Sequence, residues 1–186
     1  CCGGVVHLRF EVLQPADAAS VQQRLNAAAD AQRLPVALFG GGHVGQAIVR
    51  ALLSLPVRVH WIDSRDEVFP SGLPRWIDTE HSASVQAAVA ALAAQSRVLI
   101  MSFSHAEDLD IVAACLQRQR ERADLPFIGL IGSKSKWASF RHRLEARGFS
   151  QAELAHVTSP IGVAGVVGKE PEVIAAAVAA QLMQQR

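Results

Sequence analysis

Cysteine is scarce in this sequence, and its placement excludes a disulfide scaffold. The 186 residues include three cysteines, Cys1, Cys2 and Cys115. An adjacent pair with one distant partner cannot form a disulfide framework. Cys115 also falls within an apolar helical pattern. This usage is typical of a reducing compartment, and we expect a cytoplasmic protein.

Long apolar runs and an excess of one charge are also missing. No apolar stretch approaches the roughly 18 residues that a membrane-spanning helix needs. Eighteen basic residues face 17 acidic ones, a formal net charge of +1, so no overall field favours nucleic acid or a membrane surface. We therefore expect neither partner.

The sequence lacks the patterns that would indicate a hydrolytic or zinc-dependent chemistry. There is no Ser/His/Asp order, no paired-carboxylate site and no P-loop, and the histidine spacing does not resemble a zinc site. We accordingly assign no catalytic residue.

What the chain does have is a regular alternation of apolar strands and amphipathic helices. With 50% hydrophobic residues it can bury one substantial core. Strands are predicted at 36–39, 57–62, 73–77, 97–103 and 127–131. Such alternation predicts an α/β fold, a Rossmann-like doubly wound sheet of mainly parallel strands in the order 3-2-1-4-5. A last helix is predicted over about 171–185.

Residues 1–34 form a separate small element in this interpretation. Apolar and polar residues alternate from Val6 to Leu13, which predicts a half-buried strand. A polar, alanine-rich connecting helix follows from Pro15 to about Ala31. Pro35 marks the boundary, so the predicted domains are 1–34 and 35–186. A strand without a partner in its own chain can pair with a second copy, and we hypothesise a homodimer.

The strand at 36–39 runs into Gly40-Gly41-Gly42-His43-Val44-Gly45, which satisfies G-x-G-x-x-G and opens a helix. Gly40 permits the tight turn, Gly42 lets the backbone approach a diphosphate, and Gly45 allows close packing. The free N–H groups of the first helical turn, at His43 and Val44, then face an anion. The alternative is a turn that needs glycine for packing alone.

The next strand ends at Asp63, where a carboxylate can accept hydrogen bonds from ribose hydroxyls. Arg65 follows and is a candidate phosphate ligand. The acidic residue predicts weak tolerance of a 2′-phosphate.

More polar residues fall at the carboxyl ends of later strands, where ligands gather in open parallel sheets. Ser104 and His105 follow the fourth strand, and Ser133, Lys134 and Lys136 follow the fifth. The alternatives are a helix cap at Ser104 and His105 and a solvated surface at the lysines. Three further rim residues are Asp78, His81 and Ser102.

Five stretches together resemble the Rossmann half of the xanthine dehydrogenase accessory proteins, the XdhC/CoxI family. They are Phe39–Gly45, Asp63–Arg65, Ser102–His105, Ile128–Lys134 and Ser159–Gly162. The opening Cys1-Cys2-Gly3-Gly4 resembles the end of that family's smaller N-terminal domain, so we expect further residues before Cys1.

The resemblance implies a chaperone and not an oxidoreductase. Its ligand would be the molybdenum cofactor (molybdopterin), whose sulfuration it assists and which it inserts into an apo xanthine dehydrogenase-type molybdenum hydroxylase. A cysteine desulfurase or sulfurtransferase is a further expected partner. The Rossmann site would hold the phosphate of the cofactor. Cys1 and Cys2 are candidate molybdenum ligands, because thiolates prefer soft metals; the alternative is a pair of small residues at a strand entrance.

Two other functions fit the residues. An NAD(P)-dependent oxidoreductase would need a substrate domain and a proton donor, for which His105 is the only obvious candidate. A nucleotide-sensing regulatory domain would bind NAD(P) or another nucleotide without chemistry.

Overall fold

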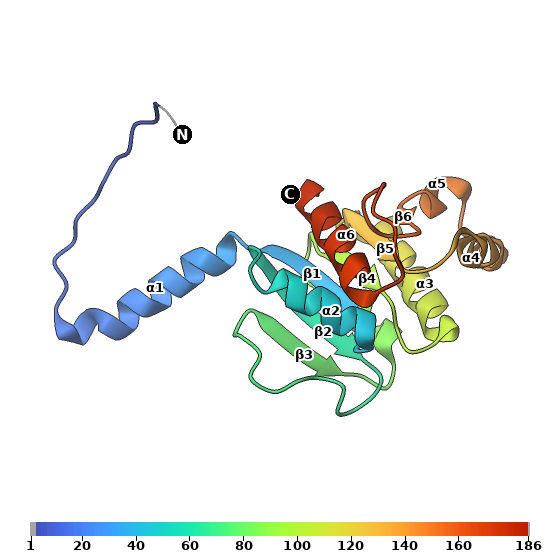
Figure 1. The fold of residues 1–186 in the computed structure, drawn as a ribbon, viewed down its shortest axis with the longest axis horizontal. Helices are drawn as coiled ribbons and strands as arrows, with labels where there is room; N and C mark the ends of the chain where they lie inside the picture. The colour runs from blue at the N-terminus through green and yellow to red at the C-terminus, as the bar shows by residue number, and fades with distance from the viewer. Residues whose placement is uncertain (1–2, 186) are drawn as a thin grey trace. The chain divides into compact units, whose positions relative to one another are not determined.

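The computed structural model describes residues 3–185 of the chain. The chain divides into two compact units, Cys1–Gln32 and Arg33–Arg186. Figure 1 traces both along the sequence. Each unit is described on its own.

The first unit contains one short 3-10 turn and one helix. They are η1, Pro15–Asp17, and α1, Ala18–Ala31. The turn begins with a capping box, in which Gln14 N–H donates to Asp17 Oδ2 over 2.8 Å. None of the residues of α1 is buried, in keeping with its thin apolar face. The predicted connecting helix is therefore confirmed.

The strand predicted at 6–13 is wrong for the single chain. In the described part of this unit the segment has no strand, and Val6, Leu8, Phe10 and Val12 are exposed. The alternation of apolar and polar residues makes a two-faced strand only when another strand satisfies its N–H and C=O groups.

The second unit is built on a six-stranded, entirely parallel sheet in the order β3-β2-β1-β4-β5-β6. The strands are β1 Leu34–Phe39, β2 Val57–Asp63, β3 Ile77–His81, β4 Arg97–Ile100, β5 Phe127–Leu130 and β6 Val157–Thr158. The predicted Rossmann-like fold and strand order are confirmed, with β6 added beyond β5. Because all strands are parallel, their carboxyl ends meet at one edge of the sheet.

Helices cover both faces of the sheet. On one face α2, His43–Leu52, lies beside α6, Pro171–Gln184 (Figure 1), and their apolar residues share a core with Leu38, Val59 and Leu99. The other core contains apolar residues of η2, Val85–Ala91; α3, His105–Arg122; α4, Lys134–Ala146; and α5, Gln151–Leu154. Two-sided coverage explains why the central strands are almost uniformly apolar. No helix in the described residues is long and apolar enough to cross a bilayer.

Two predicted elements are corrected by the structure. The third strand was predicted at 73–77 but runs over Ile77–His81. Pro74 has no N–H for a ladder, and its carbonyl accepts from Ile77 N–H over 2.9 Å in a turn, so the strand begins only there. Where the strand–helix alternation predicts an α-helix after this strand, the structure has the short 3-10 helix η2.

Candidate functional site

The glycine loop between β1 and α2 is shaped by two close backbone approaches. Gly40 has φ +127°, and a Cβ there would lie 2.0 Å from Met101 O. A Cβ on Gly45 would lie 2.0 Å from Gly40 O. These contacts give Gly40 its turn and Gly45 its close packing. Gly42, the N-cap residue of α2, has only open space around its missing side chain.

The open side of Gly42 faces a cleft of about 420 Å³ at the carboxyl edge of the sheet. Its walls come from the first turn of α2, the ends of β4 and β5, and the starts of α3 and α4. They are Gly42, His43, Val44, Gly45, Met101, Ser102, Phe103, Ser104, His105, Asp108, Ile131 and Lys136. The first turn of α2 carries no acidic residue. Its N–H groups and the helix dipole therefore favour an anion in this cleft.

Asp63 lies at the end of β2, as predicted, but its carboxylate is already occupied. Its side chain is 1% exposed and accepts hydrogen bonds at both oxygens. Gly41 N–H donates to Oδ2 over 2.5 Å, and Arg65 donates through its backbone N–H and through Nε and Nη2 over 2.8–2.9 Å. Asp63 thus fastens the glycine loop to the β2 end.

These contacts set the protonation of Asp63. Burial raises the pKa of this carboxyl, but the hydrogen bonds from Arg65 and Gly41 and the positive charge of Arg65 outweigh it, so the pKa is lowered. The Arg65 guanidinium also lies 4.7 Å from the centre of the Phe103 ring. For Asp63 to accept from a ribose hydroxyl, a ligand would have to replace one of these bonds. Arg65 uses two of its five guanidinium N–H groups on Asp63 and its side chain is 36% exposed, so its predicted contact with a phosphate does not require the pair to separate.

A second buried ion pair lies inside the cleft. Lys136 Nζ donates to Asp108 Oδ2 over 2.6 Å and to Ile131 O over 3.0 Å, and the two side chains are 12% and 3% exposed. Asp108 Oδ1 accepts from the N–H and the hydroxyl of Ser102 over 2.8 and 2.7 Å. The third ammonium N–H of Lys136 has no protein acceptor among residues 3–185 and can serve a ligand.

The remaining predicted residues divide between the cleft and the surface. Ser104 caps α3 by accepting from Glu107 N–H over 3.2 Å, and both Ser104 and His105 also line the cleft. Ser133 caps α4, accepting from Lys136 N–H over 3.1 Å. Lys134 is exposed and lies outside the cleft lining.

Asp78 and His81, which we grouped with the rim, pair elsewhere. Asp78 accepts from Arg58, and His81 pairs with Asp66 over 2.9 Å. Cys1 and Cys2 lie outside the described residues. Within those residues no group of three or more His, Cys, Asp and Glu side chains could hold a metal.

Ser102 and Lys136, which we placed on the rim, do line the cleft, whereas the polar cleft residue Asp108 was not predicted. The sequence carried only a weak signal for Asp108, as an acidic residue in the first turn of a helix that follows a strand.

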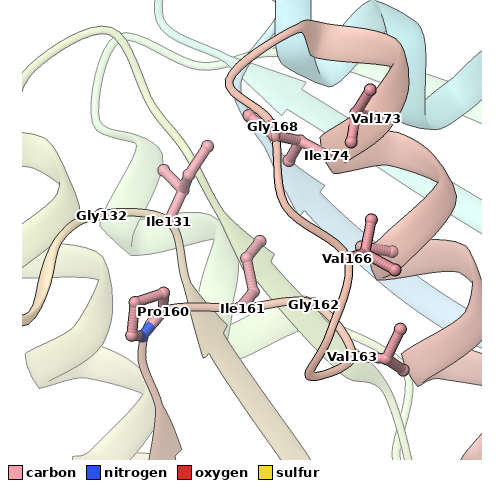
Figure 2. Close-up of a pocket in the computed structure, with 11 residues that line it drawn as sticks. Ile131, Gly132, Pro160, Ile161, Gly162, Val163, Val166, Gly168, Val173 and Ile174 are labelled. Atoms are coloured by element: carbon pink, nitrogen blue, oxygen red, sulfur yellow. The ribbon is translucent and has the colours of Figure 1, made fainter.

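A recess of about 250 Å³ adjoins the cleft at Ile131, which lines both. Figure 2 shows it between the segment that follows β5 and the glycine-rich loop leading into α6. Its walls are Ile131, Gly132, Pro160, Ile161, Gly162, Val163, Val166, Gly168, Val173, Ile174 and Ala177.

The parallel sheet, the glycine turn and the helix that starts directly after it define a Rossmann-type domain. The chain belongs to the XdhC Rossmann domain family, whose model matches residues 36–182. The family resemblance seen in the motifs is thereby confirmed.

Two known proteins are similar to this chain. The uncharacterized protein YqeB of Escherichia coli is 26% identical over 149 residues, which cover 79% of this chain and 26% of that protein. The crystal structure of a xanthine dehydrogenase from Bacillus halodurans has the same fold, with a TM-score of 0.65 and 22% identity over 82% of this chain and 42% of that one. The chain thus spans about a quarter of the curated relative and less than half of the solved structure.

Proposed function

We propose that this chain is the cofactor-binding Rossmann part of an accessory protein for a xanthine dehydrogenase-type molybdenum hydroxylase. It binds the molybdenum cofactor, assists its sulfuration and delivers it to the apo hydroxylase. The observation that carries the proposal is the cleft at the α2 start, in a chain that belongs to the XdhC Rossmann domain family.

The charges around the cleft suit the phosphate of molybdopterin. The first turn of α2 offers N–H donors and no carboxylate, and Lys136 neutralises Asp108, which is the only acidic residue in the lining. Ser104 and His105 add groups that can donate hydrogen bonds, whereas Ser102 already donates to Asp108. A phosphate placed at the helix start therefore meets no unpaired negative charge.

The proposed role is binding and release, without a reaction on this domain. The most buried ionic groups of the cleft, Asp108 and Lys136, are paired with each other, and Ser102 is tied to the same carboxylate. Cys1 and Cys2 remain the proposed molybdenum ligands, since thiolates bind soft metals. The proposed partners are the apo hydroxylase, a cysteine desulfurase or sulfurtransferase, and a second copy of the chain.

Incubation with the molybdenum cofactor, followed by gel filtration and by pterin and molybdenum analysis, tests the proposal. We expect the wild-type chain to retain both, Gly42→Asp to retain much less of both, and a Cys1→Ala/Cys2→Ala variant to retain pterin with less molybdenum. Absence of pterin from every form, beside clear NAD binding, would reject the carrier function in favour of a dehydrogenase or a nucleotide sensor.

A further inference from the structure

The cleft and the recess meet at Ile131, the residue that follows β5. The recess is bounded on its other side by α6, which contributes Ile174 (Figure 2). Ala177 of the same helix also lines it. Its loop is anchored to that helix, because Gly162 N–H donates to Gln181 Oε1 over 2.7 Å and Val163 N–H to Ala177 O over 3.2 Å. The recess is therefore a built extension of the cleft toward β5 and β6.

The chemistry of the recess differs from that of the cleft. Every lining residue is glycine, alanine, proline, valine or isoleucine, so all its polar atoms belong to the backbone. Aliphatic side chains with backbone N–H and C=O groups between them suit a flat heteroaromatic ring, whose faces are apolar and whose edge forms hydrogen bonds. An apolar cavity of about 150 Å³ holds benzene, and the recess, at about 250 Å³, has room for a fused two-ring system.

A buried polar group beside the recess also lacks a partner. Ser159 precedes Pro160 in the wall, and its hydroxyl is buried without a hydrogen-bond partner among the described residues. A buried hydroxyl left unpaired costs about 1–3 kcal/mol. A ligand or an ordered water at this place would remove that cost.

The opposite direction, toward the β2 end, is closed. A dinucleotide on a Rossmann domain extends its adenosine ribose to the acidic residue at that end. Here Asp63 already accepts four hydrogen bonds, and Arg65 lies across Phe103. Val68 lies against Gly41, where a Cβ would be 2.5 Å from its Cγ2.

We propose that the ligand runs from the α2 start into the recess, with its phosphate in the cleft and its heteroaromatic ring against Ile131, Val166 and Ile174. The β2 end contributes nothing to binding. The site therefore selects a phosphorylated heteroaromatic compound by its single phosphate arm and its ring, and an adenosine half adds no affinity. That the natural ring is a pterin rests on the proposed function. That the ligand extends from the α2 start into the recess, and not toward the β2 end, does not.

Two neighbouring valines provide a matched test. Val166 lines the recess and is 47% exposed, whereas Val167 lies outside the lining and is 92% exposed. Val166→Trp places an indole in the recess, and Val167→Trp places the same group in solvent on the same loop. Neither valine belongs to the buried core, so both variants should fold, which circular dichroism and thermal unfolding will verify.

The probes are the oxidised, fluorescent pterin phosphate obtained from the cofactor, nicotinamide mononucleotide, NAD and inorganic phosphate, titrated against the full chain. We expect Val166→Trp to raise the dissociation constants of the ring-bearing probes at least tenfold. Val167→Trp should change these dissociation constants less than twofold. Inorganic phosphate should bind both variants alike, and NAD should bind no more tightly than nicotinamide mononucleotide.

The two possible failures are distinguishable. If pterin phosphate binds the wild type and both tryptophan variants equally, the recess is not the ring site and this inference is overturned while the carrier function stands. If the wild type does not bind pterin phosphate but binds nicotinamide mononucleotide in a way that only Val166→Trp abolishes, the direction stands and the carrier function falls. NAD binding tenfold tighter than the mononucleotide overturns the closed β2 end.

Discussion

Replacement of Gly42 by aspartate should weaken the binding of an anion at the α2 start without lowering the stability of the fold. The position has φ −71° and ψ −176°, an extended backbone that any residue adopts, and nothing lies within 4 Å of the added Cβ. Aspartate is also a preferred N-cap residue and should stabilise α2 by about 0.1–0.5 kcal/mol relative to glycine. We therefore expect unchanged or slightly raised stability.

The effect on ligand binding has the opposite sign. With about 6 Å between the new carboxylate and a bound phosphate and an effective dielectric constant of about 20, two unit charges repel by about 2.8 kcal/mol. The cleft is open to solvent, and halving the repulsion for screening leaves about 1.4 kcal/mol, or about tenfold in the dissociation constant. A phosphate with more than one charge increases this loss.

Gly42→Asn is the matched control, because asparagine has nearly the same shape and capping ability without the charge. The assay is a fluorescence titration with the pterin phosphate at low and high salt, together with thermal unfolding. We expect at least a tenfold difference between the two variants at low salt and a smaller one at high salt. Equal affinities of the aspartate and asparagine variants would refute an anion site at the α2 start.

Three further predictions follow from buried groups. Lys136→Met should lower the unfolding free energy by about 3 kcal/mol, because it leaves Asp108 charged and unpaired, and a double variant that also carries Asp108→Asn should recover most of the loss in urea titrations. Burial raises the pKa of Cys115 to about 12, so in a chain without the two N-terminal cysteines a thiol reagent at pH 8 should react only as fast as the protein unfolds; rapid reaction in the native state would contradict this. The lowered pKa of Asp63 contributes stability that is fully present above the unfolded pKa of about 3.9 and is lost as pH falls through the folded value. Unfolding measured from pH 6 to pH 3 should therefore be less pH-dependent in Asp63→Asn, and identical slopes would count against the Asp63–Arg65 pair.

The sheet could be predicted because the patterns that specify its strands and helices lie within short stretches of the sequence. Apolar runs and helical periodicity are read within a dozen residues, and parallel connections leave few possible strand orders. The third strand was predicted too early in the chain. Its predicted range, 73–77, contains Pro74, which has no N–H to donate to a neighbouring strand, so the observed strand begins only at Ile77. The segment at 6–13 has a strand pattern, but a strand depends on a partner that the pattern does not specify.

The candidate site shows the same division. Spacing put Asp63 at the β2 end, but the sequence does not show that Arg65 pairs with its carboxylate, which only the folded geometry reveals. Lys134 and Lys136 differ by about 200° around α4, and the sequence does not say which of the two faces the cleft. The recess joins segments around 131, 162 and 174, whose proximity no local pattern encodes.

The hydrogen bond from Gly41 to Asp63 has a consequence for the kinetics of ligand exchange. A loop fixed by the protein before the ligand arrives loses little conformational entropy on binding, and no slow rearrangement has to precede release. If the chain carries the cofactor as proposed, its transfer to a recipient is limited by the residence time of the ligand itself. A partner that competes for the phosphate would then speed transfer without first having to open the domain.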